Sequence, residues 1–241
     1  MKNLIPIILL AALLSSCRPE APTLPAREYR CGQAATPIVV DGRLDEPAWA
    51  EAPQSEPFMD IRGEGWPEPI YRTWVKMLRD EDCLYVGAWL EEPEVKGTLT
   101  EHDSIIYRDN DFEVFLDPDG DGRLYFEIEI NALGTVLDLL MDKPYSQGGK
   151  CFIPWDCRGL QTGVALVEAD GELPAGWTVE MAIPFEALAV GGVNPGKYRE
   201  WRVNFSRVQW LREGGPEENW VWAPTGKVNM HIPSLWGVLI L

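Results

Sequence analysis

Histidine, cysteine and positive charge are all scarce in this 241-residue sequence. It has two histidines and five cysteines, and 21 lysines and arginines stand against 38 aspartates and glutamates, giving a formal net charge of −17 at pH 7. Nucleic acids and anionic lipid surfaces attract proteins through positive charge, so this composition argues against both as partners. Because histidines are few and no close cysteine pair is present, the sequence also gives little support to a zinc site.

Long hydrophobic runs are lacking too, apart from one at the N-terminus. Residues 1–17 read MKNLIPIILLAALLSSC, a lysine followed by an apolar run and then small residues. This run is too short for a membrane span and is typical of a signal peptide. Its end at Cys17 resembles a bacterial lipobox, in which that cysteine becomes the lipidated first residue. The alternative is an ordinary secretory signal with an incidental cysteine.

The lipobox predicts how the chain is divided. We expect a lipoprotein signal peptide at residues 1–16, and a lipidated Cys17 with a tether rich in proline and charge at residues 17–30. Residues 31–241 have the length of a single β-sandwich domain. The expected location is the bacterial cell envelope, periplasmic or surface-exposed, with the lipid anchor as the only contact with a membrane.

Four cysteines remain after Cys17, and in an exported protein they can form disulfides. Four cysteines allow three pairings, which the sequence does not separate. Cys151 and Cys157 bracket a short loop, so a bridge between them is geometrically easy and would leave Cys31 with Cys83. All four could equally be buried thiols.

Long helical periodicity is almost absent, and short alternating segments separated by turn signals replace it. About nine such segments predict an all-β fold, an antiparallel β-sandwich of jelly-roll type with short helical turns.

The clearest alternation lies between Asp109 and Leu140. Two segments within it place apolar residues on one face and mainly polar residues on the other, as expected for strands that cover a core. The apolar faces contain Phe112, Val114 and Leu116 in the first segment, and Leu124, Phe126, Ile128 and Ile130 in the second. The opposite faces contain Glu113 and Phe115, then Tyr125, Glu127, Glu129 and Asn131. This second face is either a solvated sheet surface or a polar binding face.

The turn between these two segments is acidic. Asp117, Asp119 and Asp121 have the spacing of the first half of an EF-hand loop, but the twelfth position is Ile128 and strands replace the flanking helices. The turn is therefore not an EF-hand. It is either a hairpin loop whose aspartates satisfy turn geometry, or a structural Ca²⁺ site made of these three carboxylates.

The glutamates of the polar face allow two chemistries. Glu127 and Glu129 lie about 7 Å apart along one strand face, within the range of roughly 5–9.5 Å that separates the two carboxylates of glycoside hydrolases. No other catalytic signature accompanies them. Carboxylates also accept hydrogen bonds from sugar hydroxyls, so binding without catalysis needs fewer assumptions.

Seven segments together resemble the carbohydrate-binding family 9-like (CBM9-like) domains. They span nearly the whole mature chain in the order expected for that family. They read VDGRLDEPAW, KMLRDEDCLYVGAWLEEP, DNDFEVFLDPDGDGRLYFEIEINALGTVLDL, WDCRGLQTGV, GWTVEMAIPF, WRVNFSRVQW and NWVWAPTGKVNMHIPSLWGVLIL. The resemblance implies a jelly-roll sandwich without catalytic activity, related to sugar-binding modules, some of which hold structural calcium.

The resemblance also suggests a site. In sugar-binding members two tryptophans clamp a terminal sugar; Tyr107 matches the first by position, and the second falls at or beside Met230 and His231. Glu113 matches the acidic residue of the family's E-x-F strand, and Glu129 matches the polar position on the next strand.

We therefore expect a non-catalytic domain that binds a saccharide or polysaccharide. Its candidate binding residues are Tyr107, Glu113, Glu129, Asn131 and His231. The alternatives are a glycoside hydrolase that uses paired glutamates, a haem-binding sandwich with Met230 or His231 as axial ligand, and a structural envelope protein.

Overall fold

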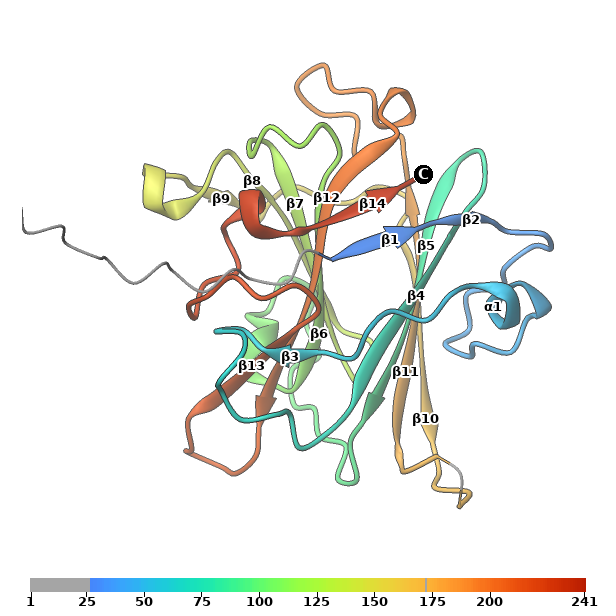
Figure 1. The fold of residues 1–241 in the computed structure, drawn as a ribbon, viewed down its shortest axis with the longest axis vertical. Coiled ribbons are helices and arrows are strands. Elements are labelled where there is room, and N and C mark those ends of the chain that lie inside the picture. The colour runs from blue at the N-terminus through green and yellow to red at the C-terminus, as the bar shows by residue number, and fades with distance from the viewer. Residues whose placement is uncertain (1–26, 172) are drawn as a thin grey trace, which may run out of the picture.

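The computed structural model describes residues 27–171 and 173–241, which form two facing β-sheets (Figure 1). The predicted signal peptide, Cys17 and most of the predicted tether lie outside the described residues. No helix within the described part of the chain is long and apolar enough to cross a membrane.

The larger sheet has nine strands, and β6 and β7 lie at its middle. Its hydrogen-bonded order is β1-β14-β12-β6-β7-β8-β9, and β13 pairs with both β12 and β3. All of these pairs are antiparallel except β1 with β14. The strands are β1 (Glu28–Arg30), β3 (Met59–Asp60), β6 (Asp111–Asp117), β7 (Tyr125–Asn131), β8 (Val136–Met141), β9 (Cys151–Phe152), β12 (Glu200–Trp210), β13 (Glu217–Val221) and β14 (Gly237–Ile240).

The smaller sheet has five strands, in the order β10-β11-β5-β4-β2. They are β2 (Gly32–Gln33), β4 (Thr73–Arg79), β5 (Cys83–Glu91), β10 (Gln161–Val167) and β11 (Gly176–Pro184). The helical elements are short: α1 (Pro47–Glu51) and the 3-10 turns η1 (Ile106–Arg108), η2 (Tyr145–Gln147), η3 (Pro195–Lys197) and η4 (Pro233–Leu235). The predicted all-β sandwich with short helical turns is confirmed.

The main core fills the space between the sheets, and the alternation of β6 and β7 supplies much of it. Phe112, Val114, Phe126 and Ile128 are at most 1 % exposed there. Helix α1 covers the outer side of the smaller sheet, where its residue Trp49 is buried. A second apolar cluster covers the outer face of the larger sheet and includes Phe115, Tyr125, Leu137, Leu139, Met230 and Trp236.

Strand β1 corrects the predicted boundary of the domain. Glu28–Arg30 pairs with β14, and Tyr29 is buried in the core with its hydroxyl donating to the Pro53 carbonyl at 2.5 Å. The sandwich therefore includes residues 28–30, which the sequence assigned to the tether because their short strand follows a proline-rich segment.

The predicted Cys151–Cys157 disulfide is not formed. All four cysteines of the described chain are free thiols. Cys151 is exposed on edge strand β9, whereas Cys157 is buried in the core between the sheets. The six-residue spacing suggested proximity, but the intervening loop carries the chain from the sheet edge into the core.

A buried ion pair links the two sheets. The guanidinium of Arg207 on β12 lies 3.5 Å from the Glu92 carboxylate, just beyond β5, and both side chains are at most 1 % exposed. Arg207 also donates to Thr73 Oγ1 at 3.0 Å, Glu91 O at 2.8 Å and Gln209 Oε1 at 2.8 Å. Each of these bonds satisfies a polar group removed from water.

Replacing this arginine tests its role. Arg207→Met should lower the free energy of unfolding by about 3–5 kcal/mol, because it removes the positive charge paired with buried Glu92, which would keep only its neutral donors Asn110 and Trp177. The matched control is Arg72→Met: Arg72 pairs with Glu91 at 3.0 Å but its side chain is 64 % exposed, so the loss should stay below about 1 kcal/mol. Urea unfolding measures both, and equal losses would contradict the assignment.

Candidate functional site

The polar face of β6 and β7 points away from the core. Antiparallel register places Glu113 directly opposite Glu129, and Phe115 opposite Glu127. Side chains of directly opposed residues are close neighbours, so three carboxylates meet on the outer face of the larger sheet. They are not solvated: Glu113, Glu127 and Glu129 are 5 %, 6 % and 2 % exposed.

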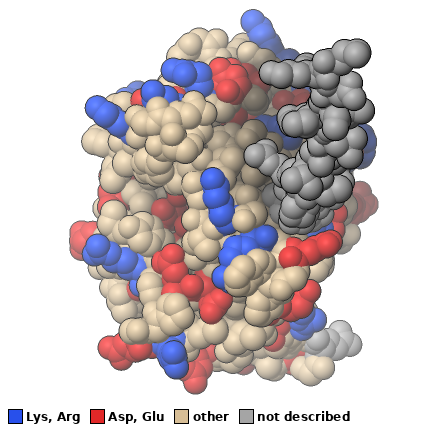
Figure 2. All heavy atoms as spheres, turned by 60° about the vertical axis from the view of Figure 1, so that its left-hand side comes forward, with Lys and Arg blue, Asp and Glu red and all other residues tan. Residues whose placement is uncertain are grey.

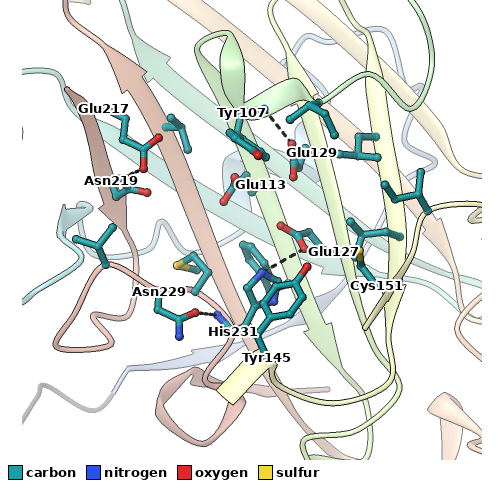
Figure 3. A pocket seen from close by; sticks show the side chains of 18 residues that line it. Tyr107, Glu113, Glu127, Glu129, Tyr145, Cys151, Glu217, Asn219, Asn229 and His231 are labelled. Atoms are coloured by element: carbon teal, nitrogen blue, oxygen red, sulfur yellow. Dashed lines mark hydrogen bonds and ion pairs between the residues drawn. The ribbon is translucent and has the colours of Figure 1, made fainter. Parts of the chain in front are cut away.

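These glutamates lie at the floor of an open cavity of about 410 Å³ (Figure 3). Its size is within the range of small-molecule sites. Four glutamates line it, whereas the lining contributed by the described chain includes neither lysine nor arginine. The lining includes Tyr107, Glu113, Glu127, Glu129, Tyr145, Glu217, Asn229, Met230 and His231.

Two exposed tyrosines border the glutamates. Tyr107 belongs to η1 and is 43 % exposed; its backbone N–H donates to Glu129 Oε2 at 3.1 Å, and its carbonyl accepts from Trp210 Nε1 at 2.9 Å. Tyr145 belongs to η2 and is 47 % exposed. Figure 3 shows the three glutamates between these two rings.

His231 lies beside the second tyrosine. The ring centroids of Tyr145 and His231 are 4.5 Å apart in an edge-on arrangement. His231 Nδ1 is 3.1 Å from the Tyr125 hydroxyl, and Nε2 is 3.8 Å from Glu127. Burial lowers the pKa of His231 to about 4, so the ring is neutral at pH 7 and acts as a polar, uncharged wall.

The carboxyl groups hold their protons unusually tightly. Burial raises the pKa of Glu113 to about 7. For Glu127 and Glu129, burial raises the pKa well above its usual value and repulsion from neighbouring carboxylates raises it further. Asp111 behaves in the same way, and its buried Oδ2 has no hydrogen-bond partner among the described residues. These carboxylates are buried and close together, so their negative charges repel one another away from water. A cation bound among them would therefore be strongly stabilised.

Comparison with known proteins identifies the family. The family model described as Carbohydrate family 9 binding domain-like matches residues 40–241. The chain belongs to this family. Among curated proteins, none matches the sequence significantly.

Solved structures share the fold of this family 9 domain. One is a carbohydrate binding module family 9 (CBM9) from Caldicellulosiruptor kristjanssonii in complex with cellotriose, with a TM-score of 0.63, 17% identity, and coverage of 89% of this chain and 93% of the other. The complex of a CBM9 from the same organism with glucose has a TM-score of 0.62 and 17% identity, and the match covers 88% of this chain and 95% of the other. A protein from Bacteroides uniformis, provisionally described as carbohydrate-binding, has a TM-score of 0.67 and 16% identity, and the match covers 90% of this chain and 99% of the other.

Four of the five predicted site residues meet in the cavity of this family 9 domain: Tyr107, Glu113, Glu129 and His231. Asn131 does not line it. Its amide donates to Leu99 O and Asp109 Oδ2, both at 2.9 Å, and its Oδ1 accepts from backbone N–H groups of the β7–β8 turn. The alternation correctly placed Asn131 on the same face, but the strand end carries it beneath a loop, where its role is structural.

Tyr145, Glu217 and Asn229 were missed by sequence reasoning. They come from loops and from β13, far from β6 in the chain. Tyr145 lies in the connection between β8 and β9, close to His231. The family resemblance places the second sugar-clamping position at or beside Met230 and His231. Only the folded chain brings the β8–β9 connection next to that position, so no local sequence signal could have indicated Tyr145.

The acidic turn lies outside the cavity. One oxygen from each of Asp117, Asp119 and Asp121 lies within 4.8 Å of the others. Asp117 is buried and accepts from the backbone N–H groups of Gly120 at 3.1 Å and Gly122 at 2.9 Å. Burial raises the pKa of Asp117 to about 7. The carboxylates both satisfy turn geometry and gather donors suited to Ca²⁺.

The raised pKa values predict how stability depends on pH. The pKa of Glu113 is about 4.5 in the unfolded chain and about 7 in the folded protein, so between these pH values the folded state binds more protons. Stability should therefore fall as pH rises through this window, by up to about 1.4 kcal/mol per pH unit for each retained proton. Thermal unfolding from pH 4.5 to 8 measures this loss.

The variant Glu113→Gln should make that loss smaller, because one of the retained protons is gone. The control Glu64→Gln changes an exposed loop residue and should leave the slope unchanged. A stability that rises with pH over this window would show that the glutamates are ionised in the folded protein.

Proposed function

We propose that the cavity binds a saccharide without catalysing its hydrolysis. The observation that carries the proposal is the arrangement of exposed Tyr107 and Tyr145 around buried carboxylates in one open cavity. Aromatic rings pack on the apolar faces of sugar rings, and carboxylates accept hydrogen bonds from hydroxyl groups. Family membership and the sugars bound by the two similar CBM9 structures support this assignment.

The charge of the lining narrows the ligand class. Four glutamates surround the cavity without a basic partner in its described lining, and neutral His231 adds no positive charge. A saccharide that carries an amine would supply that charge and form charge-assisted hydrogen bonds with the carboxylates. The preferred ligand is therefore an amino sugar or a saccharide ending in one.

Calorimetric titration tests both saccharide binding and the preference for an amino sugar. Cellotriose and glucose should bind, and glucosamine should bind about tenfold more tightly than glucose, in line with the extra strength of a hydrogen bond to a charged group. N-acetylglucosamine, which lacks the charge, should lose that advantage. Tyr145→Ala should lower the affinity for every saccharide that binds by roughly tenfold. The control is Tyr198→Ala, because Tyr198 is exposed and lies outside the cavity lining; this change should leave the affinities unaltered.

Each negative outcome has a distinct meaning. Absence of binding by all of these sugars would overturn the proposed function. Binding of glucose without preference for glucosamine would overturn only the ligand class. Hydrolysis of an aryl glycoside that disappears in Glu129→Gln would replace binding by glycosidase activity.

The proposed location is the bacterial cell envelope, with a lipid anchor at Cys17. Its support is the lipobox-like sequence before Cys17 in the full chain. Cys17→Ser should move the expressed full-length protein from the membrane fraction to the soluble fraction, because the acyl chains are lost. Fractionation followed by immunoblotting measures this, and a wild-type protein found only in the soluble fraction would refute the anchor.

The acidic turn is proposed to hold Ca²⁺ through Asp117, Asp119 and Asp121. The donor set fits, since hard carboxylate oxygens are the ligands that Ca²⁺ prefers. Bound calcium would stabilise the β6–β7 connection, from which both pocket strands extend. CaCl2 should therefore raise the melting temperature of the wild-type protein, and Asp121→Asn should abolish that rise.

A further inference from the structure

His102 is surrounded by three carboxylates at the edge of the larger sheet. Its Nε2 lies 3.5 Å from Asp103 Oδ1, 3.5 Å from Asp138 Oδ1 and 3.6 Å from Asp156 Oδ1. The four residues come from three parts of the chain: the loop before η1, strand β8 and the loop after β9. None of them lines the saccharide cavity.

Asp138 is the decisive member of this group. Its side chain is 3 % exposed, and its Oδ2 accepts from the Cys157 backbone N–H. Its Oδ1 is buried, faces His102 and has no hydrogen-bond partner among the described residues. Asp103 Oδ1 is also buried and, within the described part of the chain, accepts no hydrogen bond. An unsatisfied buried carboxylate oxygen is expensive, and metal coordination is one of the two usual ways to compensate it.

We propose that His102, Asp103, Asp138 and Asp156 bind Zn²⁺. His102 Nε2 lies 3.5–3.6 Å from an oxygen of each aspartate, close to the ligand-to-ligand distance of about 3.4 Å in a tetrahedral zinc site with bonds of 2.0–2.2 Å. The ligand atoms of His102, Asp103 and Asp138 all lie within 4.8 Å of one another. Asp156, whose side chain is 67 % exposed, would supply the fourth ligand after a rotation of that side chain.

The imidazole favours zinc over calcium. Ca²⁺ takes six to eight oxygen ligands, whereas zinc accepts four ligands and combines imidazole with carboxylate. The acidic turn at Asp117, Asp119 and Asp121 offers oxygen ligands alone, so the two sites should prefer different ions.

The consequence of zinc binding would be structural. The ion would fasten the loop that contains His102 and Asp103 to β8 and to the segment that leads into buried Cys157. Asp103 already adopts a left-handed backbone conformation, with φ of 61°, and donates its N–H to Val136 O at 3.0 Å. The fastened loop leads directly into η1, which contains Tyr107.

Thermal unfolding and calorimetric titration of the chelator-treated protein with ZnCl2 alone test the proposal. Zn²⁺ should raise the melting temperature and bind at one site, and both His102→Gln and Asp156→Asn should lower its affinity by at least about tenfold. His102 and Asp156 are 54 % and 67 % exposed, so neither change should prevent folding. The control Asp121→Asn alters the exposed side of the acidic turn and should leave zinc binding unchanged.

A parallel titration with CaCl2 separates the two sites. Ca²⁺ stabilisation should be lost in Asp121→Asn and retained in His102→Gln. Zinc binding that survives both His102→Gln and Asp156→Asn, or no zinc binding by the wild-type protein, would overturn the proposal and leave His102 as a polar neighbour of the three carboxylates. Neither result would bear on saccharide binding.

Discussion

Pleating of β6 and β7 is the constraint on which the rest of the structure depends. Successive side chains of a strand point to opposite faces, so Phe112 and Val114 can enter the core only if Glu113 faces outward. A shift of either strand by one residue would move glutamates between the sheets, at a prohibitive desolvation cost. The apolar face thus fixes the position of the carboxylates, although no favourable interaction among them does so.

Crowded carboxylates are a poor solution for stability alone. Glu113 opposite Glu129 is an unfavourable cross-strand pair when both are charged, and burial under the surrounding loops makes ionisation harder still. The protein retains this arrangement next to two exposed tyrosines. Proton uptake relieves the repulsion in the free protein, and a ligand that carries positive charge would relieve it in the complex.

The two proposed metal sites differ in how far apart their ligands lie in the sequence. Asp117, Asp119 and Asp121 are neighbours in sequence, so their spacing alone suggested calcium. His102 and Asp138 are 36 positions apart, and the sequence offered only a lone histidine and a scarcity of cysteine pairs. Pairing of β7 with β8 and the return of the chain through Asp156 bring these donors together, which no local spacing reveals.

The sequence by itself determined the two-sheet fold and most of the polar face, because period-two alternation is a local consequence of strand geometry. It also indicated Tyr107, Glu113, Glu129 and His231 through the family resemblance. Only the tertiary structure decided that the carboxylates are buried, that Asn131 supports a turn, that Cys151 and Cys157 are separate, and that Tyr145 supplies a second aromatic wall. These outcomes depend on loops folding over the sheet, where contacts between distant residues replace local periodicity.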